Sequence, residues 1–473
     1  MSQAQEIAAF GLELVQAWRR TGASRALIRD VQERRLRAVL AAAARTRFYG
    51  GRRLERLHDV APVRKADLQA RLDDTFTDPA LSKAALLSFV HGGAAPGSLL
   101  HGRYLVATTS GTTGHVGLFV DDVAGWARQR AVVFARMFQG LLTPEGFAQL
   151  ARRRYRLAFV IASGGHWLTS ILAGRMPTLG RAVADSRIVP VDAPLPQVVA
   201  ELNAFAPLLL HSYPTFLEVL CAEARTGRLR IDPELVSAGS EPISQSCRAA
   251  VRAAVPRARL VETYAATECL AMATSCPHGA VHVNEDACVL EPVDDDLVPV
   301  PAGTDAPRVL VTNLVNVVQP LVRYELTDSV TIIDEPCPCG SPFARIAVRG
   351  RTDDTFFLID GQGRAQAHPP IPIEVAFLGV AGLLQYQIVH EAQNRVRLSF
   401  VADHDARPAE VAAALDERLA RYLDDHGLLA HVSYVIEQVD AVERHARSNK
   451  LRQIESRVAR PGGDVVAAIA ARR

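Results

Sequence analysis

Several features that would restrict the function of this chain are missing from its 473 residues. No apolar run approaches the roughly 20 residues that a membrane-spanning helix needs, so we expect no membrane partner. The first residues lack a basic start followed by an apolar core, so we expect no signal peptide. The formal net charge is only +2, which gives no reason to expect nucleic acid or an anionic membrane surface as a partner.

Cysteine is also sparse. Seven cysteines are present and most are scattered singly, which argues against a disulfide framework. With the missing leader pattern, this predicts a cytoplasmic protein. Hydrophobic residues make up 49% of the chain and charged residues 22%, as in an ordinary globular protein and unlike a disordered one. The length exceeds one ordinary core and predicts two or three domains.

The most informative feature that is present is a polar segment directly after the apolar run 104–106. Residues 108–114 hold five hydroxyl side chains and two glycines. Glycines let the backbone approach a ligand closely, and N–H groups and hydroxyls can donate to phosphate oxygens. The segment lacks the Gly-Lys-Ser/Thr ending of a P-loop. An ordinary Ser/Thr turn is the alternative interpretation.

Five further motifs follow this segment along the chain. They are Gly239-Ser240-Glu241-Pro242, Tyr264-Ala265-Ala266-Thr267-Glu268, Arg323-Tyr324-Glu325-Leu326-Thr327-Asp328, Gly350-Arg351-Thr352-Asp353-Asp354 and Ser448-Asn449-Lys450-Leu451-Arg452. With the polar segment they resemble, in order, the motifs of the adenylate-forming (ANL) superfamily of ligases. The opening of the chain resembles the phenylacetate–coenzyme A ligase, or CapK-like, branch. The shared features there are helices, the pair Phe48-Tyr49 and the segment Lys65-Ala66-Asp67-Leu68.

The order of elements predicts an α/β fold. Apolar spacing predicts helices within 3–46, 121–139 and 243–254, whereas short apolar runs at 157–162 and 208–210 predict buried strands. Short strands are expected at 309–311, 321–324 and 330–333. After residues 351–354 the pattern predicts strands at 385–390, 396–401 and 431–437 and a helix at 408–425. We therefore expect an acyl-CoA synthetase-like chain. It would have a large N-terminal AMP-binding α/β domain (1–352) with sheets and a short β-rich region, and a small mobile α+β C-terminal lid domain (353–473).

The resemblance implies a role for each motif residue in the use of ATP. The β- and γ-phosphates would be held by Ser110, Gly111, Thr112, Thr113 and Gly114, and adenine would pack on Gly239, Ser240, Glu241 and Pro242. Tyr264 and Ala265 belong to the next nucleotide-binding motif, in which Thr267 would donate to the α-phosphate and Glu268 would bind Mg²⁺. Asp328 and Arg351 would contact the ribose, and Asp353 would be the hinge of the lid. Lys450 would bridge the acid's carboxylate and the α-phosphate.

Other interpretations stay open for some of these residues. Lys450 could be a solvated surface lysine. His166, which follows a predicted strand at the edge where α/β sheets bind ligands, could contact the carboxylate or gate the acceptor tunnel, or could be a structural histidine. The chain also departs from the family pattern, and each departure could reshape the nucleotide pocket. The departures are Glu325, Leu326, Thr327, Ala265 and Asn449.

A second group of residues suggests a metal site. Cys337-Pro338-Cys339-Gly340 is a turn that can present two thiolates to one ion, and one more Cys and a His would complete the tetrahedral coordination that suits Zn²⁺. Ligases of the phenylacetate type resemble this chain in carrying such a set, which implies Cys276, His282, Cys337 and Cys339 as ligands of a structural zinc ion. His278 competes with His282 by spacing, and buried free thiols are the alternative.

Three functions are compatible with these motifs. The first is an ATP-dependent acid–thiol ligase that activates a carboxylic acid, expected to be an aryl acid, and transfers it to coenzyme A with release of AMP and pyrophosphate. The second is a biosynthetic adenylating enzyme whose acceptor is a carrier-protein thiol or an amine. The third is an inactive nucleotide-binding relative. The nearness of the resemblance to phenylacetate–coenzyme A ligases favours the first, and a homodimer is a possible assembly.

Overall fold

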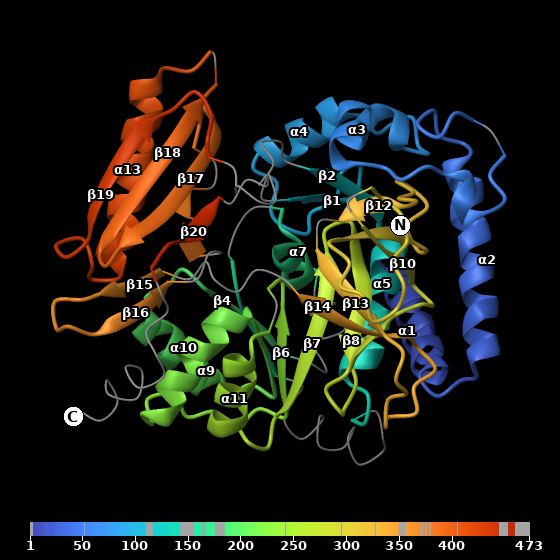
Figure 1. Ribbon diagram of the computed structural model, residues 1–473, viewed down its shortest axis with the longest axis horizontal. Coiled ribbons are helices and arrows are strands. Elements are labelled where there is room, and N and C mark those ends of the chain that lie inside the picture. Colours follow the sequence, from blue (N-terminus) through green and yellow to red (C-terminus); the bar gives the residue numbers. More distant parts are fainter. Residues whose placement is uncertain are drawn as a thin grey trace.

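The computed structural model describes the chain in segments, numbered 3–51, 53–109, 117–141, 156–162, 166–175, 185–241, 243–294, 296–326, 328–349, 356–368, 372–373, 376–377, 380–403, 405–443 and 453–458. Within these segments the elements form an N-terminal body around one large sheet and a C-terminal body around a smaller one (Figure 1). Each body has its own cluster of buried hydrophobic residues.

The chain opens with two helices where the sequence predicts one helical region over 3–46. α1 (Gln3–Arg20) and α2 (Arg25–Ala43) are separated by a turn. Ser24 precedes α2 in an extended conformation, and its Oγ accepts a hydrogen bond from Leu27 N at 3.3 Å. A serine cap of this kind satisfies an N–H group that the first helical turn leaves free, so it starts a new helix. The next helical segments are η1 (Leu57–Asp59), α3 (Lys65–Ala70), η2 (Leu72–Thr75) and α4 (Lys83–His91).

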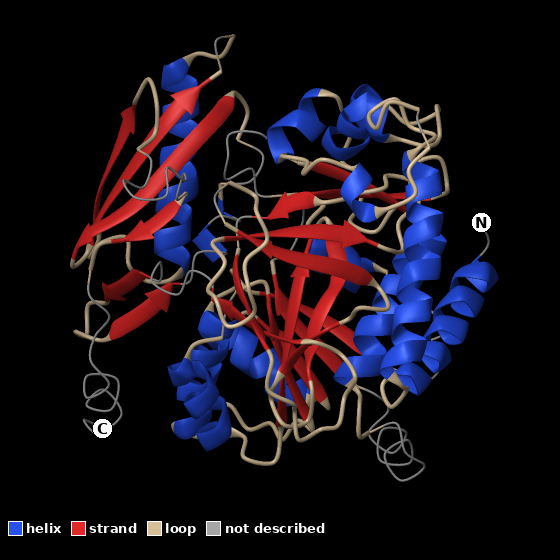
Figure 2. Ribbon diagram, turned by 45° about the vertical axis from the view of Figure 1, so that its right-hand side comes forward, coloured by secondary structure: helices blue, strands red, loops and turns tan. Residues whose placement is uncertain are grey.

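Nine strands of the described chain form the large sheet, in the order β13-β14-β9-β8-β7-β6-β5-β3-β4. The parallel half runs from β4 to β7, and the strands from β7 to β13 pair antiparallel. Figure 2 shows the strands of the chain in red and the helices in blue. These strands are β3 (Leu157–Ile161), β4 (Ser186–Pro190), β5 (Leu209–Ser212), β6 (Leu235–Gly239), β7 (Arg259–Ala266), β8 (Cys269–Ser275), β9 (Val281–Val283), β13 (Ser329–Ile333) and β14 (Arg345–Arg349).

Helices cover both faces of the parallel half, as the apolar strands predict. On one face lie α9 (Leu195–Phe205), α10 (Pro214–Arg225) and α11 (Gln245–Ala254), whose apolar residues share a buried cluster with β3, β5 and β6. On the other face, α5 (Val123–Met137) packs on the sheet and α1 packs on α5 (Figure 1). The short helix α7 (Leu168–Gly174) lies near β1 and β3. The predicted strands at 157–162 and 208–210 and the helices within 121–139 and 243–254 are therefore confirmed.

Two smaller sheets complete the N-terminal body. β1 (Tyr104–Thr108) pairs with β2 (Leu118–Asp122), and β11 (Arg308–Asn313) lies between β10 (Cys288–Val293) and β12 (Tyr324–Leu326). The strand expected at 321–324 is wrong, since β12 begins only at Tyr324. Arg323 has a φ of +51°, in the left-handed region, and an L-residue in that conformation cannot continue a strand.

The C-terminal body is an α+β unit, close to the prediction. β17 (Leu383–Ala392) and β18 (Arg395–Ala402) form a hairpin, to which β19 (Ser433–Gln438) and β20 (Ile454–Ser456) add in parallel. α13 (Pro408–Asp425) packs its apolar face on this sheet and spans the predicted residues 408–425. β15 (Phe356–Ile359) and β16 (Ala365–His368) form a separate hairpin. The expected domain boundary at 352/353 lies outside the described residues.

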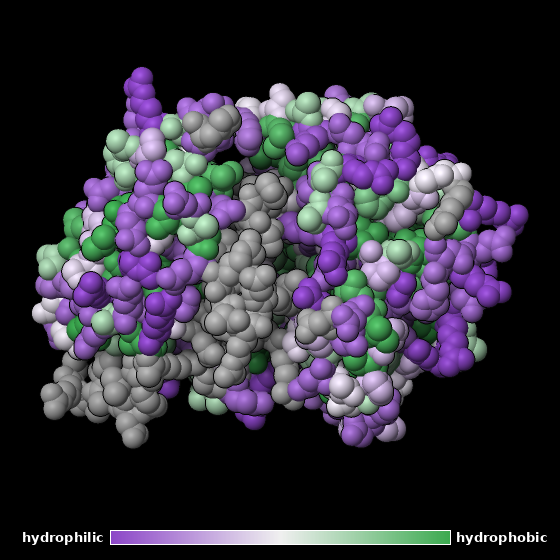
Figure 3. Space-filling view, turned by 45° about the horizontal axis from the view of Figure 1, so that its top comes forward, coloured by the Kyte–Doolittle hydropathy of each residue, from purple (hydrophilic) through white to green (hydrophobic). Residues whose placement is uncertain are grey.

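The surface mixes polar and apolar residues. Hydrophilic residues dominate the face seen in Figure 3, with hydrophobic residues interspersed among them. Within the described segments, every helix is too short or too polar to cross a bilayer.

Candidate functional site

The candidate site lies at the carboxyl ends of the parallel strands β5, β6 and β7. Because these strands run side by side in the same direction, the residues that follow them meet at one edge of the sheet. Beyond β6 the chain turns at Ser240, whose φ of +67° is rare for a residue with a side chain. Beyond β7 it turns back at once, because Ala266 pairs with Cys269 and leaves Thr267 and Glu268 as a two-residue turn.

Glu268 is buried although it lies in a turn, with 8% of its surface exposed. Its Oε1 accepts a hydrogen bond from Tyr324 Oη at 3.2 Å, and its backbone carbonyl accepts one from Asn313 Nδ2 at 3.1 Å. Burial raises the pKa of Glu268, and the nearby Lys65 opposes that rise. A buried carboxylate is a suitable ligand for a hard divalent cation.

Lys65 stands at the base of the polar segment 110–116, whose own residues lie outside the described part. Its Nζ donates to Thr109 Oγ1 at 3.1 Å. The same hydroxyl oxygen accepts from Gly117 N at 2.9 Å, and Thr109 N donates to Gly117 O at 3.0 Å. The residues on either side of the segment are thus joined to one another and to Lys65. Burial lowers the pKa of Lys65, against the attraction of Glu268.

Tyr264 and Asp328 form the next part of the site. Tyr264 Oη donates to Asp328 Oδ2 at 2.9 Å, which joins the Tyr-Ala-Ala-Thr-Glu motif to the end of the Arg-Tyr motif. Burial, followed by the charge of Asp328, raises the pKa of Tyr264, so this hydroxyl stays a donor at neutral pH. Ala265 is partly buried beside the apolar cluster that includes α5.

Two departures from the family pattern have structural explanations. Glu325 pairs with Arg308 on the neighbouring strand and, at 3.7 Å, with Arg64. Leu326 is buried in the core beneath the small sheets. These side chains help to hold β12 in place.

Glu241 occupies the position predicted to lie near adenine. Its Oε2 accepts hydrogen bonds from Thr215 N at 3.1 Å and Thr215 Oγ1 at 2.7 Å, at the start of α10. Its Oε1 is buried without a hydrogen-bond partner in the described structure. Burial raises the pKa of Glu241 to about 7. Gly239 leaves little room at this position, since a Cβ there would lie 3.3 Å from Thr263 O.

His166 is held by the backbone on both sides of its ring. Nδ1 lies 3.2 Å from Val106 O and Nε2 lies 3.1 Å from Ala94 O, and its own carbonyl accepts from Thr108 N at 2.8 Å. Burial lowers its pKa. Since both nitrogens face backbone carbonyls, the arrangement favours the structural alternative over a contact with substrate.

Some predicted site residues lie outside the described structure, so their positions stay predictions. They are Ser110, Gly111, Thr112, Thr113, Gly114, Pro242, Arg351, Asp353 and Lys450.

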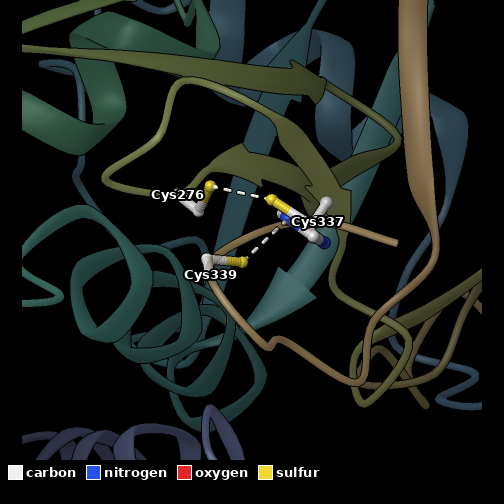
Figure 4. A group of neighbouring side chains, drawn as sticks. Cys276, Cys337 and Cys339 are labelled. Atoms are coloured by element: carbon white, nitrogen blue, oxygen red, sulfur yellow. Dashed lines mark hydrogen bonds between the residues drawn. The ribbon is translucent and has the colours of Figure 1, made fainter. Parts of the chain in front are cut away.

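The predicted metal ligands come together at one corner of the large sheet (Figure 4). Cys276 directly follows β8, His282 lies on β9, and Cys337 and Cys339 lie in the loop between β13 and β14. Because β14 pairs with β9, with Arg345 opposite His282, this loop is brought against the histidine. The competing residue His278 is exposed in the turn after β8.

The spacing of the four ligand atoms fits a tetrahedral ion. Cys276 Sγ lies 3.7 Å from Cys337 Sγ, Cys339 Sγ lies 3.4 Å from His282 Nε2, and all four atoms lie within 4.8 Å of one another. Zn–S bonds of about 2.3 Å at a tetrahedral angle place two sulfurs about 3.8 Å apart, and a sulfur and a nitrogen about 3.5 Å apart. His282 Nδ1 contacts Phe343 O at 2.9 Å, which leaves Nε2 as the ligand atom.

Three contact residues of the site were missed as functional residues in the sequence. Lys65 and Tyr324 lie within quoted motifs without a role, and Thr215 lies in none. Lys65 is 44 positions from Thr109 in the chain, and Tyr324 is 56 positions from Glu268. Separations of this size cannot be inferred from local spacing. The sequence offered one signal for two of them: Lys65 and Tyr324 are polar residues inside segments that resemble family motifs.

Comparison with known proteins supports the fold. No protein-family model matches the chain, and no curated protein sequence does. Solved structures of 2-hydroxyisobutyryl-CoA ligase are similar to it at 18% sequence identity. One, with 2-HIB-AMP and CoA in the thioesterification state, has a TM-score of 0.56 and covers 96% of this chain and 93% of that chain. Another, with 2-HIB-AMP in the postadenylation state, has a TM-score of 0.52 at the same coverage. An open conformation of the same ligase with 2-HIB-AMP and CoA has a TM-score of 0.52 and covers 92% of this chain and 93% of that chain. The chain therefore shares the fold of this CoA ligase, and the fold class expected from the sequence is confirmed.

Proposed function

We propose that this chain is an adenylate-forming acid–thiol ligase that uses ATP to activate a carboxylic acid and then transfers the acyl group to coenzyme A. The observation that carries the proposal is the surroundings of Glu268. This buried carboxyl lies where parallel strands end, beside Lys65, Tyr324 and the base of a hydroxyl-rich segment. The chain also shares its fold with 2-hydroxyisobutyryl-CoA ligase, of which one structure holds 2-HIB-AMP and CoA.

The proposed reaction has two steps. A carboxylate oxygen of the acid attacks the α-phosphorus of ATP, and the bond from that phosphorus to the bridging oxygen breaks and releases pyrophosphate. The sulfur of CoA, as thiolate, then attacks the acyl carbon, AMP leaves, and the thiol proton passes to solvent. Both steps gain most from positioning and charge neutralisation, because no covalent bond to the protein is formed.

The residues take the following roles in this proposal. Glu268 would hold Mg²⁺, whose charge would offset that of the leaving pyrophosphate. Thr267 donates to the α-phosphate, Asp328 accepts from the ribose hydroxyls, and Glu241 faces adenine with its unpartnered oxygen. For residues 110–114, Pro242, Arg351, Asp353 and Lys450 the support is the motif resemblance alone. That resemblance also supports an aryl acid as substrate.

We also propose that Cys276, His282, Cys337 and Cys339 hold a structural Zn²⁺. Four nitrogen and sulfur ligands complete tetrahedral coordination, so the site offers no open position for substrate. The ion would tie the loop between β13 and β14 to the end of β8, and so fix the antiparallel side of the large sheet.

Pyrophosphate release tests the ligase proposal. The protein is assayed with ATP, Mg²⁺ and a panel of aryl and short acyl acids, with and without CoA. We expect release with one class of acid, accelerated by CoA. Glu268→Gln should lower the rate about 100-fold, because it removes a charged ligand of the metal. Glu417→Gln, an exposed acid on α13, is the matched control and should keep the rate.

The remaining outcomes separate the alternatives. Release that CoA does not change would indicate a carrier-protein thiol or an amine as acceptor. No release with any acid, combined with no calorimetric signal for ATP, would contradict the proposal.

A further inference from the structure

A polyphosphate needs positive charge around it, and the predicted phosphate segment supplies none of its own. Residues 108–117 read Thr-Thr-Ser-Gly-Thr-Thr-Gly-His-Val-Gly and contain no lysine or arginine. Hydroxyls and backbone N–H groups can donate hydrogen bonds to phosphate oxygens, but they do not neutralise the charge. If the chain binds ATP as proposed, the positive charge beside this segment comes from elsewhere, and a fixed cation of the N-terminal body would add to the charges of Mg²⁺ and Lys450.

Lys65 is placed to do so. Its ammonium donates to Thr109 Oγ1 at 3.1 Å, and its Cε would lie 3.1 Å from a Cβ built on Gly117. Thr109 and Gly117 are the residues on either side of segment 110–116. The lysine therefore lies against both ends of the segment, and its side chain is only partly buried, so that a ligand can reach it.

The fold holds this lysine firmly. Lys65 is the first residue of α3, and Val63, two residues earlier, pairs with Tyr324 of β12. Val63 N donates to Arg323 O and Glu325 N donates to Val63 O, each at 2.9 Å. β12 also carries Tyr324, which donates to Glu268. The short strand β12 therefore positions both Lys65 and Tyr324, the residue that donates to Glu268.

The chain contains very few lysines. Of its 53 basic residues, only three are lysines, namely Lys65, Lys83 and Lys450. Arginine is thus used almost everywhere that a positive charge is enough. An ammonium is compact and can approach a phosphate as a point charge where a planar guanidinium would not fit. Lys83 is exposed at the start of α4, whereas Lys65 lies at the candidate site.

We propose that Lys65 is a phosphate-binding residue, which supplies the N-terminal body with a fixed positive charge for the phosphates of the nucleotide. The proposal rests on the adenylation function proposed above. In the ligand-free chain the charge of Glu268 attracts that of Lys65. With Mg²⁺ held at Glu268, the ammonium would be available to the phosphate oxygens. This lysine is distinct from Lys450, which belongs to the C-terminal part of the chain.

Calorimetric titration with Mg·ATP and, separately, with adenosine tests this role. Lys65→Met keeps the length of the side chain and removes its charge. We expect Mg·ATP to bind 10- to 100-fold more weakly to this variant, while adenosine, which has no phosphate, binds within twofold of wild type. Lys65→Arg should recover part of the loss, because it restores the charge. Lys83→Met is the matched control, since it also removes a lysine from the first position of a helix, and should change neither affinity.

The outcomes separate a phosphate contact from a structural role. Equal loss of Mg·ATP and adenosine binding by Lys65→Met, or no loss of either, would overturn the role of Lys65 and leave the ligase proposal standing. Failure of the wild-type protein to bind Mg·ATP would instead remove the proposed function itself. Thermal unfolding of each variant shows whether it is folded at the temperature of the titration.

Discussion

Glu241 and Glu268 are two carboxyls at the same edge of the sheet with different surroundings. Burial raises the pKa of both. Glu268 has a lysine and a tyrosine hydroxyl beside it, which favour its ionised form. Glu241 receives its hydrogen bonds from Thr215, at the start of α10, and no positive charge contributes to its pKa. The first carboxyl is therefore suited to a cation, and the second to hydrogen bonding in its neutral form near pH 7.

Glu241 makes a pH-dependent contribution to stability whose sign follows from its pKa. The folded pKa of about 7 lies above the ordinary value of 4.5, which applies to the unfolded chain. The contribution is therefore complete below pH 4.5 and is lost as the pH rises through 7. Gln does not titrate. As the pH rises across this window, the free energy of unfolding of wild type should therefore fall relative to that of Glu241→Gln by about 1–3 kcal/mol.

Chemical denaturation at a series of pH values measures this difference. Comparison of wild type with Glu241→Gln removes the contributions of all other groups that titrate in the same window. Two curves that stay parallel between pH 4 and 8 would show that the Glu241 carboxyl keeps an ordinary pKa in the folded chain.

Single residues also show why sequence reasoning reached some of the site and not the rest. Motif letters identified Glu268 and Asp328, because those residue types at those spacings are distinctive. They did not reveal that Tyr324 donates to Glu268 or that Tyr264 donates to Asp328, since both contacts form only when β7 and β12 come together. By sequence His166 is compatible with a contact to the carboxylate, a gate of the acceptor tunnel or a structural role, and the backbone carbonyls beside both its ring nitrogens favour the last.

At the scale of elements, local pattern predicted most strands and helices and missed the places where one residue interrupts them. α13 spans the predicted 408–425 because its apolar spacing and the proline at its start are both local signals. The break between α1 and α2 depends on a cap at Ser24, which a continuous helical pattern hides. The predicted strand at 321–324 fails at Arg323, whose left-handed φ is stabilised by contacts distant in sequence, including Thr312 Oγ1 accepting from its N–H at 2.9 Å.

The cysteine–histidine cluster makes a prediction about the sheet corner formed by β8, β9 and β14. Replacing Cys337 and Cys339 together by Ser should abolish bound zinc and lower the free energy of unfolding by several kcal/mol. The loss should stay below the roughly 10 kcal/mol typical of a whole zinc-finger peptide, because a large sheet already supports this corner. Metal analysis of the purified protein and denaturant unfolding measure the two effects.

A cysteine outside the cluster provides the control. Cys221 is buried on α10, in the cluster between the sheet and α9–α11, so Cys221→Ala should keep the zinc even if it costs some stability. Zinc-free wild type, or a double variant that retains one equivalent of zinc, would contradict the metal proposal.

At the scale of the whole molecule, the chain consists of two bodies with separate cores. The C-terminal body buries residues from β15, β17, β18, α13 and β20 in its own cluster and could keep its internal packing in more than one orientation. Length and the change of pattern after residue 350 predicted this division. The sequence could not show which residues face each other between the bodies, because such contacts depend on orientation and leave no periodic pattern.

The division into two bodies leads to a prediction about the two chemical steps. If the C-terminal body rotates about Asp353, as the family resemblance implies, Lys450 is needed only in the orientation that forms the acyl-adenylate. Its ammonium would offset charge as the carboxylate attacks the α-phosphate, and it has no part in attack by the thiol. Lys450→Ala should therefore lower pyrophosphate release about 100-fold or more, while thioester formation from preformed acyl-adenylate and CoA falls less than about tenfold.

Each half-reaction is measured alone, with Lys83→Ala as the control that should leave both unchanged. Lys65→Met should differ from Lys450→Ala by weakening Mg·ATP binding itself, because its cation belongs to the N-terminal body. Equal losses in both half-reactions for Lys450→Ala would mean that one orientation serves both steps, and the rotation would then have no role in catalysis.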